Sequence, residues 1–439
     1  MKINFVKSAR LVMSGFIAVA FVSAGFMAHA HFAVQKGRIP SDAPADVRAQ
    51  IESLGSPDAV KRAAAAYALS NQGEKAAAAI PFLIDLLGDD TPVDPSLYRK
   101  KDSWCRGCPS QEHSPGKEAA IALTDIGSRA VDPLIAALND NRWVARKNAA
   151  WALGAIGDEK AVTALGAALK DVEPKVREQA AWASGAIGDD RSVEALSAAL
   201  TDQYAEVRKQ VVWALGAIGS ERGVEGLGRA LKDADSGVRT QAAWALGAIG
   251  AGEAAHWLNE ALRDENAEVR KQAAWASGAI GDRRAVEGLR AAMSDQHAGV
   301  REQAAWALGA IGDSQGVEAL NFALKDSNHQ VRTQAAWALG AIGDNRGVDA
   351  LTGALSDENA DVRTQAAWAL GAIGSSRAVD GLIGALKDAD ADVRTQSAWA
   401  LGAIGDSRAA DALTVALKDP DVKVRRQAAW ALSVVGFDK

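Results

Sequence analysis

The sequence has 439 residues, of which 48% are hydrophobic, and its formal net charge at pH 7 is −6. Much of the hydrophobic content is alanine, and aromatic residues, which favour strands, make up only 5% of the chain, so the composition favours closely packed helices. The acidic balance argues against a nucleic-acid-binding protein, which needs a basic stripe on one face.

Residues 1–30 have the pattern of a secretory signal peptide. Lys2, Lys7 and Arg10 precede an apolar run over residues 11–26, and residues 28–30 (Ala-His-Ala) place small residues where a signal peptidase cuts. A retained membrane anchor is the alternative, but the run is shorter than the roughly 20 residues of a spanning helix. Removing three of the 49 basic residues leaves 46 against 55 acidic ones, a net charge of −9. We therefore expect an exported, periplasmic protein without a membrane span after cleavage.

Residues 31–127 contain degenerate copies of the repeat that fills the rest of the chain. VKRAAAAYALSNQG (Val60 to Gly73) is one copy, with Tyr67 at a position that tryptophan takes later, and EAAIALTDIG (Glu118 to Gly127) is another. We therefore predict that residues 31–127 form atypical N-terminal repeats.

Residues 89–116 interrupt this region with a proline-rich loop that carries the two cysteines of the chain, Cys105 and Cys108. Such a close pair can form a disulfide in an oxidising compartment, which is the interpretation we favour. Two alternatives remain open: a redox-active thiol pair, for which the βαβ surroundings are missing, and a metal site that includes His113. A c-type haem is excluded by Pro109, since histidine would follow the second cysteine.

Residues 128–439 form a regular array with a period of 31 residues. Such a period indicates one supersecondary unit copied along the chain, each copy burying its apolar face against its neighbours. The period is clearest in ten tryptophans, each inside a block close to VRTQAAWALGAIG: Trp151, Trp182, Trp213, Trp244, Trp275, Trp306, Trp337, Trp368, Trp399 and Trp430.

Each unit is predicted to be a helix, a turn, a helix and a turn. In the unit at residues 159–189, apolar residues at three- and four-residue steps predict a first helix over 160–170 and a second over about 174–187. Gly188 then supplies the left-handed residue that ends the second helix, and Asp189 can cap the next first helix.

Two charged positions recur with the same strictness. An arginine opens each second helix six residues after an aspartate, a spacing that lets charge-assisted hydrogen bonds run from unit to unit. Such a row could bind an ion or an acidic ligand, but we favour a structural role because paired charges fix orientation and are mostly unavailable to ligands. The pairs begin at Asp171 with Arg177 and end at Asp419 with Arg425.

The segment LKDADADVRTQSAWALGAIGD (Leu386 to Asp406) resembles HEAT repeats of the short bacterial kind found in phycobilisome-lyase-like proteins. The regular match covers roughly residues 128 to 436. The resemblance implies an all-α HEAT-like α-solenoid, a right-handed superhelix of about twelve stacked helix pairs. Stacked at roughly 8 to 10 Å each, these pairs would form a gently curved rod on the order of 100 Å long.

A helical wheel places Trp182 away from the core stripe of Val176, Ala180, Ala183 and Ile187. HEAT-like solenoids place the second helix on the concave side, which implies a concave strip of indoles flanked by glutamines. Such a strip suits an extended peptide, a protein partner or a glycan chain. The predicted binding residues are Trp182, Trp213, Trp244, Trp275, Trp306, Trp337, Trp368 and Trp399 with Gln179, Gln210, Gln241, Gln272, Gln303, Gln334, Gln365 and Gln396.

A packing role for the tryptophans is the alternative. A glycine inside a helix costs roughly 1 kcal/mol relative to alanine, so a recurring helical glycine should admit a close neighbour. That neighbour could be the next indole, and the two roles can coexist if only one ring edge is covered. The glycines are Gly154, Gly185, Gly216, Gly247, Gly278, Gly309, Gly340, Gly371 and Gly402.

Catalytic constellations are missing from the sequence. The histidines are scattered, and none forms the paired His-Glu motifs with which HEAT-like deoxyhypusine hydroxylases hold two irons. We therefore expect a non-catalytic, exported binding scaffold with no cofactor and no metal. The alternatives are an oxidoreductase or lyase-like enzyme that uses the cysteine loop, and a purely structural spacer.

Overall fold

The computed structural model describes residues 38–99 and 113–435 of the chain. Its helices α1 to α24 form twelve successive pairs, and no strand is found in the described residues beyond a single bridge between Val93 and His113. The predicted all-α class and the number of pairs are therefore confirmed. The signal-peptide region and both cysteines lie outside the described residues, so the predicted leader and disulfide stay predictions.

The helices of each pair differ in length. The first three pairs are irregular: α1 Ala45–Leu54 with α2 Ala59–Ser70, α3 Ile80–Leu86 with α4 Pro115–Ile126, and α5 Val131–Ala137 with α6 Trp143–Ile156. The other first helices are short: α7 Val162–Ala168, α9 Val193–Ala199, α11 Val224–Ala230, α13 Ala255–Ala261, α15 Val286–Ala292, α17 Val317–Ala323, α19 Val348–Ala354, α21 Val379–Ala385 and α23 Ala410–Ala416. The other second helices are twice as long: α8 Pro174–Ile187, α10 Ala205–Ile218, α12 Ser236–Ile249, α14 Ala267–Ile280, α16 Ala298–Ile311, α18 His329–Ile342, α20 Ala360–Ile373, α22 Ala391–Ile404 and α24 Val422–Val435.

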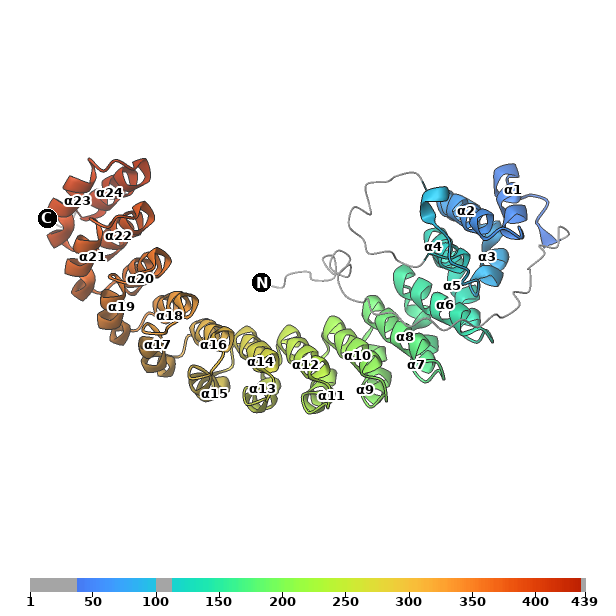
Figure 1. Cartoon of the computed structure of the whole chain (residues 1–439), viewed down its shortest axis with the longest axis horizontal. Helices are drawn as coiled ribbons and strands as arrows, with labels where there is room; N and C mark the ends of the chain where they lie inside the picture. The colour runs from blue at the N-terminus through green and yellow to red at the C-terminus, as the bar shows by residue number, and fades with distance from the viewer. Residues whose placement is uncertain (1–37, 100–112, 436–439) are drawn as a thin grey trace. The chain divides into compact units, whose positions relative to one another are not determined.

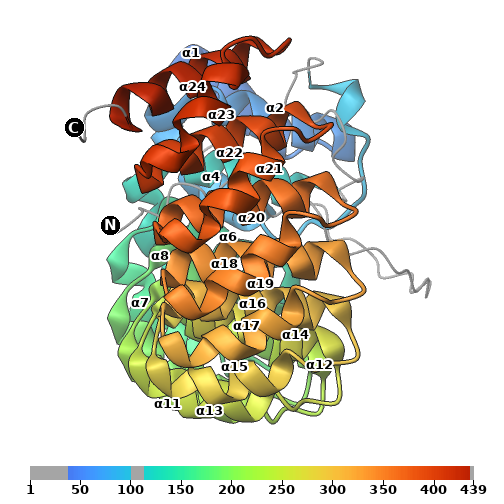
Figure 2. The same ribbon diagram turned by 90° about the vertical axis from the view of Figure 1, so that its left-hand side faces the viewer.

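The chain divides into two compact units, Met1–Gly223 and Val224–Lys439. In the second unit, successive second helices pack directly against one another, whereas successive first helices make few contacts. Because the second helices lie closer together, this unit bends towards them, and they line the inner side of the bend (Figure 1). Figure 2 shows the same helices stacked one above another.

The local signals read from the sequence determine where the helices begin and end. The second helix of the unit at residues 159–189 is α8, with the predicted bounds, and Gly188 follows it with φ 77°. The first helix differs from the prediction, since a 3-10 turn over Glu159–Ala161 precedes the short α7. The side chain of Asp189 caps the equivalent 3-10 turn of the next unit by accepting a hydrogen bond from the amide of Arg191, at 2.8 Å.

The core consists of small and branched side chains from both rows of helices. Val176, Ala180 and Ala183 are fully buried, as the helical wheel predicts. Ile187 is only half-buried, whereas Ala181, which the wheel places off the stripe, is fully buried. Ala181 is buried because each second helix also packs against the second helices of the neighbouring repeats, which a wheel of one helix does not include.

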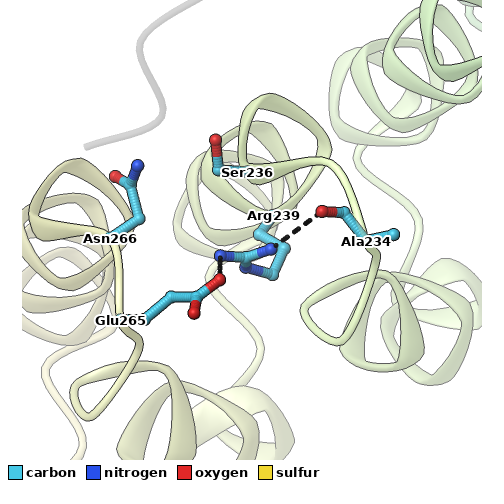
Figure 3. A pocket seen from close by; sticks show the side chains of 5 residues that line it. All are labelled: Ala234, Ser236, Arg239, Glu265 and Asn266. Carbon is cyan, nitrogen blue, oxygen red and sulfur yellow. Dashed lines mark hydrogen bonds and ion pairs between the residues drawn. The ribbon is translucent and has the colours of Figure 1, made fainter.

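The recurring arginines and aspartates form a ladder of ion pairs that runs from repeat to repeat within each compact unit. The guanidinium of Arg239 donates to Asp264 Oδ2 and Oδ1 at 2.7 and 2.9 Å, to Glu265 at 3.2 Å, and to the carbonyls of Asp233 and Ala234 at 2.9 and 3.3 Å. Figure 3 shows Arg239 between Ala234 and Glu265 in an open depression. Because all five N–H groups of Arg239 are used, the guanidinium has no donor left for a ligand, which supports the structural role.

The hydrogen bonds of the ladder also make the stability of the fold depend on pH. Burial raises the pKa of Asp326, but the hydrogen bonds from Arg301 and the Asn328 amide, and the charges of Arg301 and Arg332, outweigh it and place the pKa below the ordinary 3.8. A lowered carboxylate pKa stabilises the fold fully above the ordinary pKa, and that stability is lost as the pH falls through the folded-state pKa.

We therefore expect the cost of Asp326→Asn to depend on pH. The urea midpoint of the variant should lie below that of the wild-type protein at pH 7. The difference should shrink as the pH falls below 3.8 and vanish below the folded-state pKa of Asp326. Urea unfolding followed by circular dichroism between about pH 7 and pH 2.5 measures this difference. A gap that persists unchanged at the acid end would contradict the role assigned to the Asp326 carboxylate.

Candidate binding surface

The tryptophan row, Trp182 to Trp399 at 31-residue steps, lies on the second helices. Every indole of the row is half-buried, so the rings are neither core residues nor free on the surface. In the second unit they belong to the helices on the inner side of its bend (Figure 1). Trp430 on α24 continues the register and is 43% exposed, since no described helix follows it.

One edge of each indole packs on the preceding repeat. A Cβ atom on Gly309 would lie 2.7 Å from Trp337 Cζ3 and 2.7 Å from the Cα of Ala338. The same close approach recurs at Gly154, Gly185, Gly247, Gly278, Gly340, Gly371 and Gly402. Glycine is therefore required here because the next second helix and its indole lie against its backbone. The packing role of the tryptophans is confirmed.

The opposite edge of each indole is unpartnered. Cζ3 belongs to the six-membered ring on the side away from Nε1, so the edge that enters the glycine contact is not the polar edge. None of the row's indole N–H groups is hydrogen-bonded to another described residue, although buried tryptophans usually find an acceptor. Packing of one edge therefore leaves the other edge able to donate to a ligand.

The glutamine row, Gln179 to Gln396, lies one helical turn before the tryptophans, on the same side of each second helix. These amides are half-buried and form no side-chain hydrogen bond with another residue in the described ranges. The amide nitrogen of Gln210 and the amide oxygen of Gln241 are buried without a partner. Because a buried atom is closed to solvent, only the partly exposed atoms of these amides could bond a ligand.

The positions that vary between repeats on this surface are largely occupied within their own helices. Lys175 pairs with Glu178 at 2.8 Å. The hydroxyl of Thr240 donates to the Ser236 carbonyl at 2.8 Å, and Thr395 bonds the Ala391 carbonyl in the same way. The invariant indoles and amides, and not the variable residues, are thus the unpartnered groups of this surface.

Exposed alanines, which were not predicted from the sequence, widen the apolar surface. Each lies one turn after a tryptophan, where its methyl group extends the area beside the ring. The four-residue step from each tryptophan is the signal that could have identified them. They are Ala248, Ala279, Ala310, Ala341, Ala372 and Ala403.

The ends of the insertion are fixed by a buried carboxylate. Glu118 on α4 is fully buried and accepts hydrogen bonds from Tyr98 at 2.9 Å and Arg99 at 2.6 Å, with His113 Nδ1 at 3.2 Å. Burial and the neighbouring Glu118 charge raise the pKa of Tyr98. Arg99 also lies 5.0 Å from the ring centre of Tyr67, the residue at the tryptophan position of α2. Tyr98 and Arg99, in the described part of the insertion, therefore lie against the residue at the tryptophan position of α2.

The described residues contain no group of three or more His, Cys, Asp or Glu side chains placed to hold a metal ion. No helix in residues 38–99 and 113–435 is long and apolar enough to cross a membrane. The proposed metal ligand His113 instead faces Glu118, and the cysteines that would complete such a site lie outside the described ranges.

Solved structures similar to this one are helical solenoids. Kap121p is 14% identical, with a TM-score of 0.55 over 90% of this chain and 49% of its own. Kap95p, in a complex with RanGDP, is 14% identical, with a TM-score of 0.53 over 91% of this chain and 60% of its own. An engineered protein is 26% identical over 70% of this chain and 98% of its own, with a TM-score of 0.44.

No curated protein matches the sequence. The model of the PBS lyase HEAT-like repeat matches residues 61–89. The model of HEAT repeats matches five overlapping segments, 116–173, 163–247, 224–308, 286–370 and 350–433, which together cover more than half of the chain. The chain therefore belongs to the HEAT-repeat family.

Proposed function

We propose that this protein is an exported, non-catalytic scaffold that binds an extended segment of a partner protein along the tryptophan and glutamine rows. The observation that carries the proposal is the repeated pair of unpartnered groups, an indole N–H and a glutamine amide, beside exposed apolar area on successive second helices. Export rests on the leader-like residues 1–30, and the absence of chemistry rests on the missing catalytic motifs.

The spacing of the helices supports an extended polypeptide as the ligand. Packed helices lie roughly 8 to 10 Å apart, and an extended or polyproline chain advances about 3.1 to 3.4 Å per residue, so three ligand residues span roughly one repeat. Each repeat could then bond one main-chain group of the ligand through its amide or indole, while a ligand side chain lies on the ring. A protein solenoid of this fold can bind a protein partner, as Kap95p binds RanGDP.

The proposal predicts separable effects of the two rows. Gln303, Gln334 and Gln365 form no side-chain hydrogen bond with another described residue, so replacing all three by alanine should weaken ligand binding and leave the urea midpoint nearly unchanged. At about 1 kcal/mol per lost hydrogen bond, the loss is about 3 kcal/mol, or roughly a hundredfold in affinity. Replacing Trp306, Trp337 and Trp368 should lower both affinity and stability, since these rings also pack on glycines.

The ligand for this test is a peptide selected from a displayed random library for binding to the purified protein. Fluorescence anisotropy then measures the affinity of the selected peptides for each variant. The matched control replaces Glu287 and Glu318, exposed on the first helices α15 and α17, by glutamine, and should leave affinity unchanged. Equal affinity of the selected peptides for the wild-type protein and the triple glutamine variant would refute the proposal. Selection of glycans but no peptides from parallel libraries would replace the polypeptide by a carbohydrate ligand.

A further inference from the structure

The inner side of the second unit presents the same four side chains on the successive helices α18, α20 and α22. On α18 they are Thr333, Gln334, Trp337 and Ala341, which lie on one side of the helix, and the same residue types recur at 31-residue steps on α20 and α22. We call this surface the neutral strip. Because none of its side chains is charged, a charged group placed on it would lose water without gaining an ion pair.

The indoles of the neutral strip offer one hydrogen-bond donor per repeat. An indole N–H can donate but cannot accept. The nitrogens of Trp337, Trp368 and Trp399 have no partner among the described residues, and none of them is a buried atom, so each N–H reaches solvent. The hydroxyl of Thr333 already donates to the His329 carbonyl, at 2.8 Å. The strip therefore calls for a ligand that supplies an acceptor at every repeat.

The glycine contacts hold these donors at a regular spacing. A Cβ atom on Gly309, Gly340 or Gly371 would lie 2.7, 2.8 or 2.7 Å from the Cα of the alanine on the next second helix. Because backbone lies against backbone at each step, one repeat follows the next at a similar distance, roughly the 8 to 10 Å of packed helices. Identical donors at one spacing are all used only by a ligand whose own repeat matches that spacing.

This requirement distinguishes between the regular conformations of a polypeptide. A β-strand turns successive residues to opposite sides, so a ligand strand with three residues per repeat would present a group to one indole and turn the next group away. An α-helix uses its carbonyls within itself. A polyproline II helix has three residues per turn and free carbonyls, and one turn of about 9 Å matches the spacing of the repeats.

On the basis of the proposed function, we infer that the ligand of the neutral strip is a proline-rich segment in the polyproline II conformation, bound at one turn per repeat. On each helix the indole N–H donates to a ligand carbonyl, the glutamine amide donates to another, and proline rings pack on the indole and the alanine methyl group. Proline has no N–H that would need an acceptor. Its helix also exists before binding, so less conformational entropy is lost.

Fluorescence anisotropy of labelled peptides with the purified protein tests the inference. A proline dodecamer forms about four turns and should bind, and each turn removed from it should weaken binding about fivefold, the equivalent of about one hydrogen bond. The matched control is a dodecamer of alternating glycine and serine, which has the same number of carbonyls but no preformed helix. It should show no saturable binding where the proline peptide saturates, and equal binding of the two would overturn the inference.

Two proline dodecamers with four glutamates each test the threefold period. Glutamates at every third position lie along one side of the polyproline helix and can all face solvent. Glutamates at every second position of the first eight residues point to all sides, so at least one must meet the neutral strip. The second peptide should bind about tenfold more weakly than the first, although both carry the same charge. Equal affinities would overturn the binding of one turn per repeat.

The library-selected peptides separate this inference from the proposed function. The variant with Gln303, Gln334 and Gln365 replaced by alanine should bind the proline dodecamer more weakly, and unchanged binding would place the peptide elsewhere and overturn the inference. If selected peptides depend on these glutamines but the proline dodecamer does not bind, only the polyproline conformation is refuted. If neither the dodecamer nor any selected peptide binds, the proposed function fails as well.

Discussion

Replacing Arg332 by alanine should lower the free energy of unfolding by about 3 to 5 kcal/mol, the cost of leaving one member of a buried ion pair alone. Arg332 is 6% exposed, and its guanidinium holds both oxygens of Asp357 at 2.7 and 2.9 Å and the carbonyl of Asp326 at 2.8 Å. The variant leaves the Asp357 carboxylate poorly solvated and without its partner. Urea unfolding measures the loss, and hydrogen exchange should show it first in α18 and α20.

The matched control is Arg346→Ala. Arg346 lies in the 3-10 turn Asn345–Gly347, is about half exposed and pairs with Asp344, so its loss should cost under about 1 kcal/mol. A second variant, Arg332→Met with Asp357→Leu, should recover most of the stability because it removes both charges together. If Arg332→Ala costs no more than Arg346→Ala, the ladder orients the repeats without stabilising them.

Most of the fold is predictable from the sequence because each repeat determines its own local structure. The positive φ angle of Gly188, the capping by Asp189 and the bounds of α8 depend on residues within a few positions of one another. Because the repeat recurs every 31 residues, a prediction that is correct for one repeat is also correct for the others. The first helices are less regular than predicted because a 3-10 turn begins each of them, and apolar periodicity does not distinguish that turn from an α-helix.

The binding surface is only partly predictable, because it depends on contacts between repeats. The helical wheel correctly takes Trp182 off the core stripe, but it misses the burial of Ala181, which a neighbouring helix covers. The wheel describes a single helix and contains no information about the next one. The buried Glu118 with Tyr98 and Arg99 is missed for a similar reason, since the insertion separates these residues by about twenty positions in the chain.

Replacing Gly309 by alanine should destabilise the protein by about 2 to 3 kcal/mol, although alanine is the better helix former by about 1 kcal/mol. The new Cβ would lie 2.7 Å from the Cα of Ala338 as well as from Trp337 Cζ3, and a backbone atom cannot move aside without shifting α18. The close packing of α16 on α18 is therefore expected to open. Urea unfolding should report the loss of stability, and a red shift of the fluorescence should report indoles newly exposed to water.

Gly353 provides the matched control because it lies in a helix, α19, but an added Cβ there would meet no neighbouring atom within 4 Å. Gly353→Ala should therefore raise the free energy of unfolding by about 0.5 to 1 kcal/mol through the ordinary helix preference. Glycine-to-alanine substitution is thus expected to lower the free energy of unfolding at position 309 and to raise it at position 353. This difference separates the helix preference of alanine from the contact between repeats. If Gly309→Ala also stabilises the protein, the glycine does not serve to admit the next indole, and the tryptophan row loses its packing role.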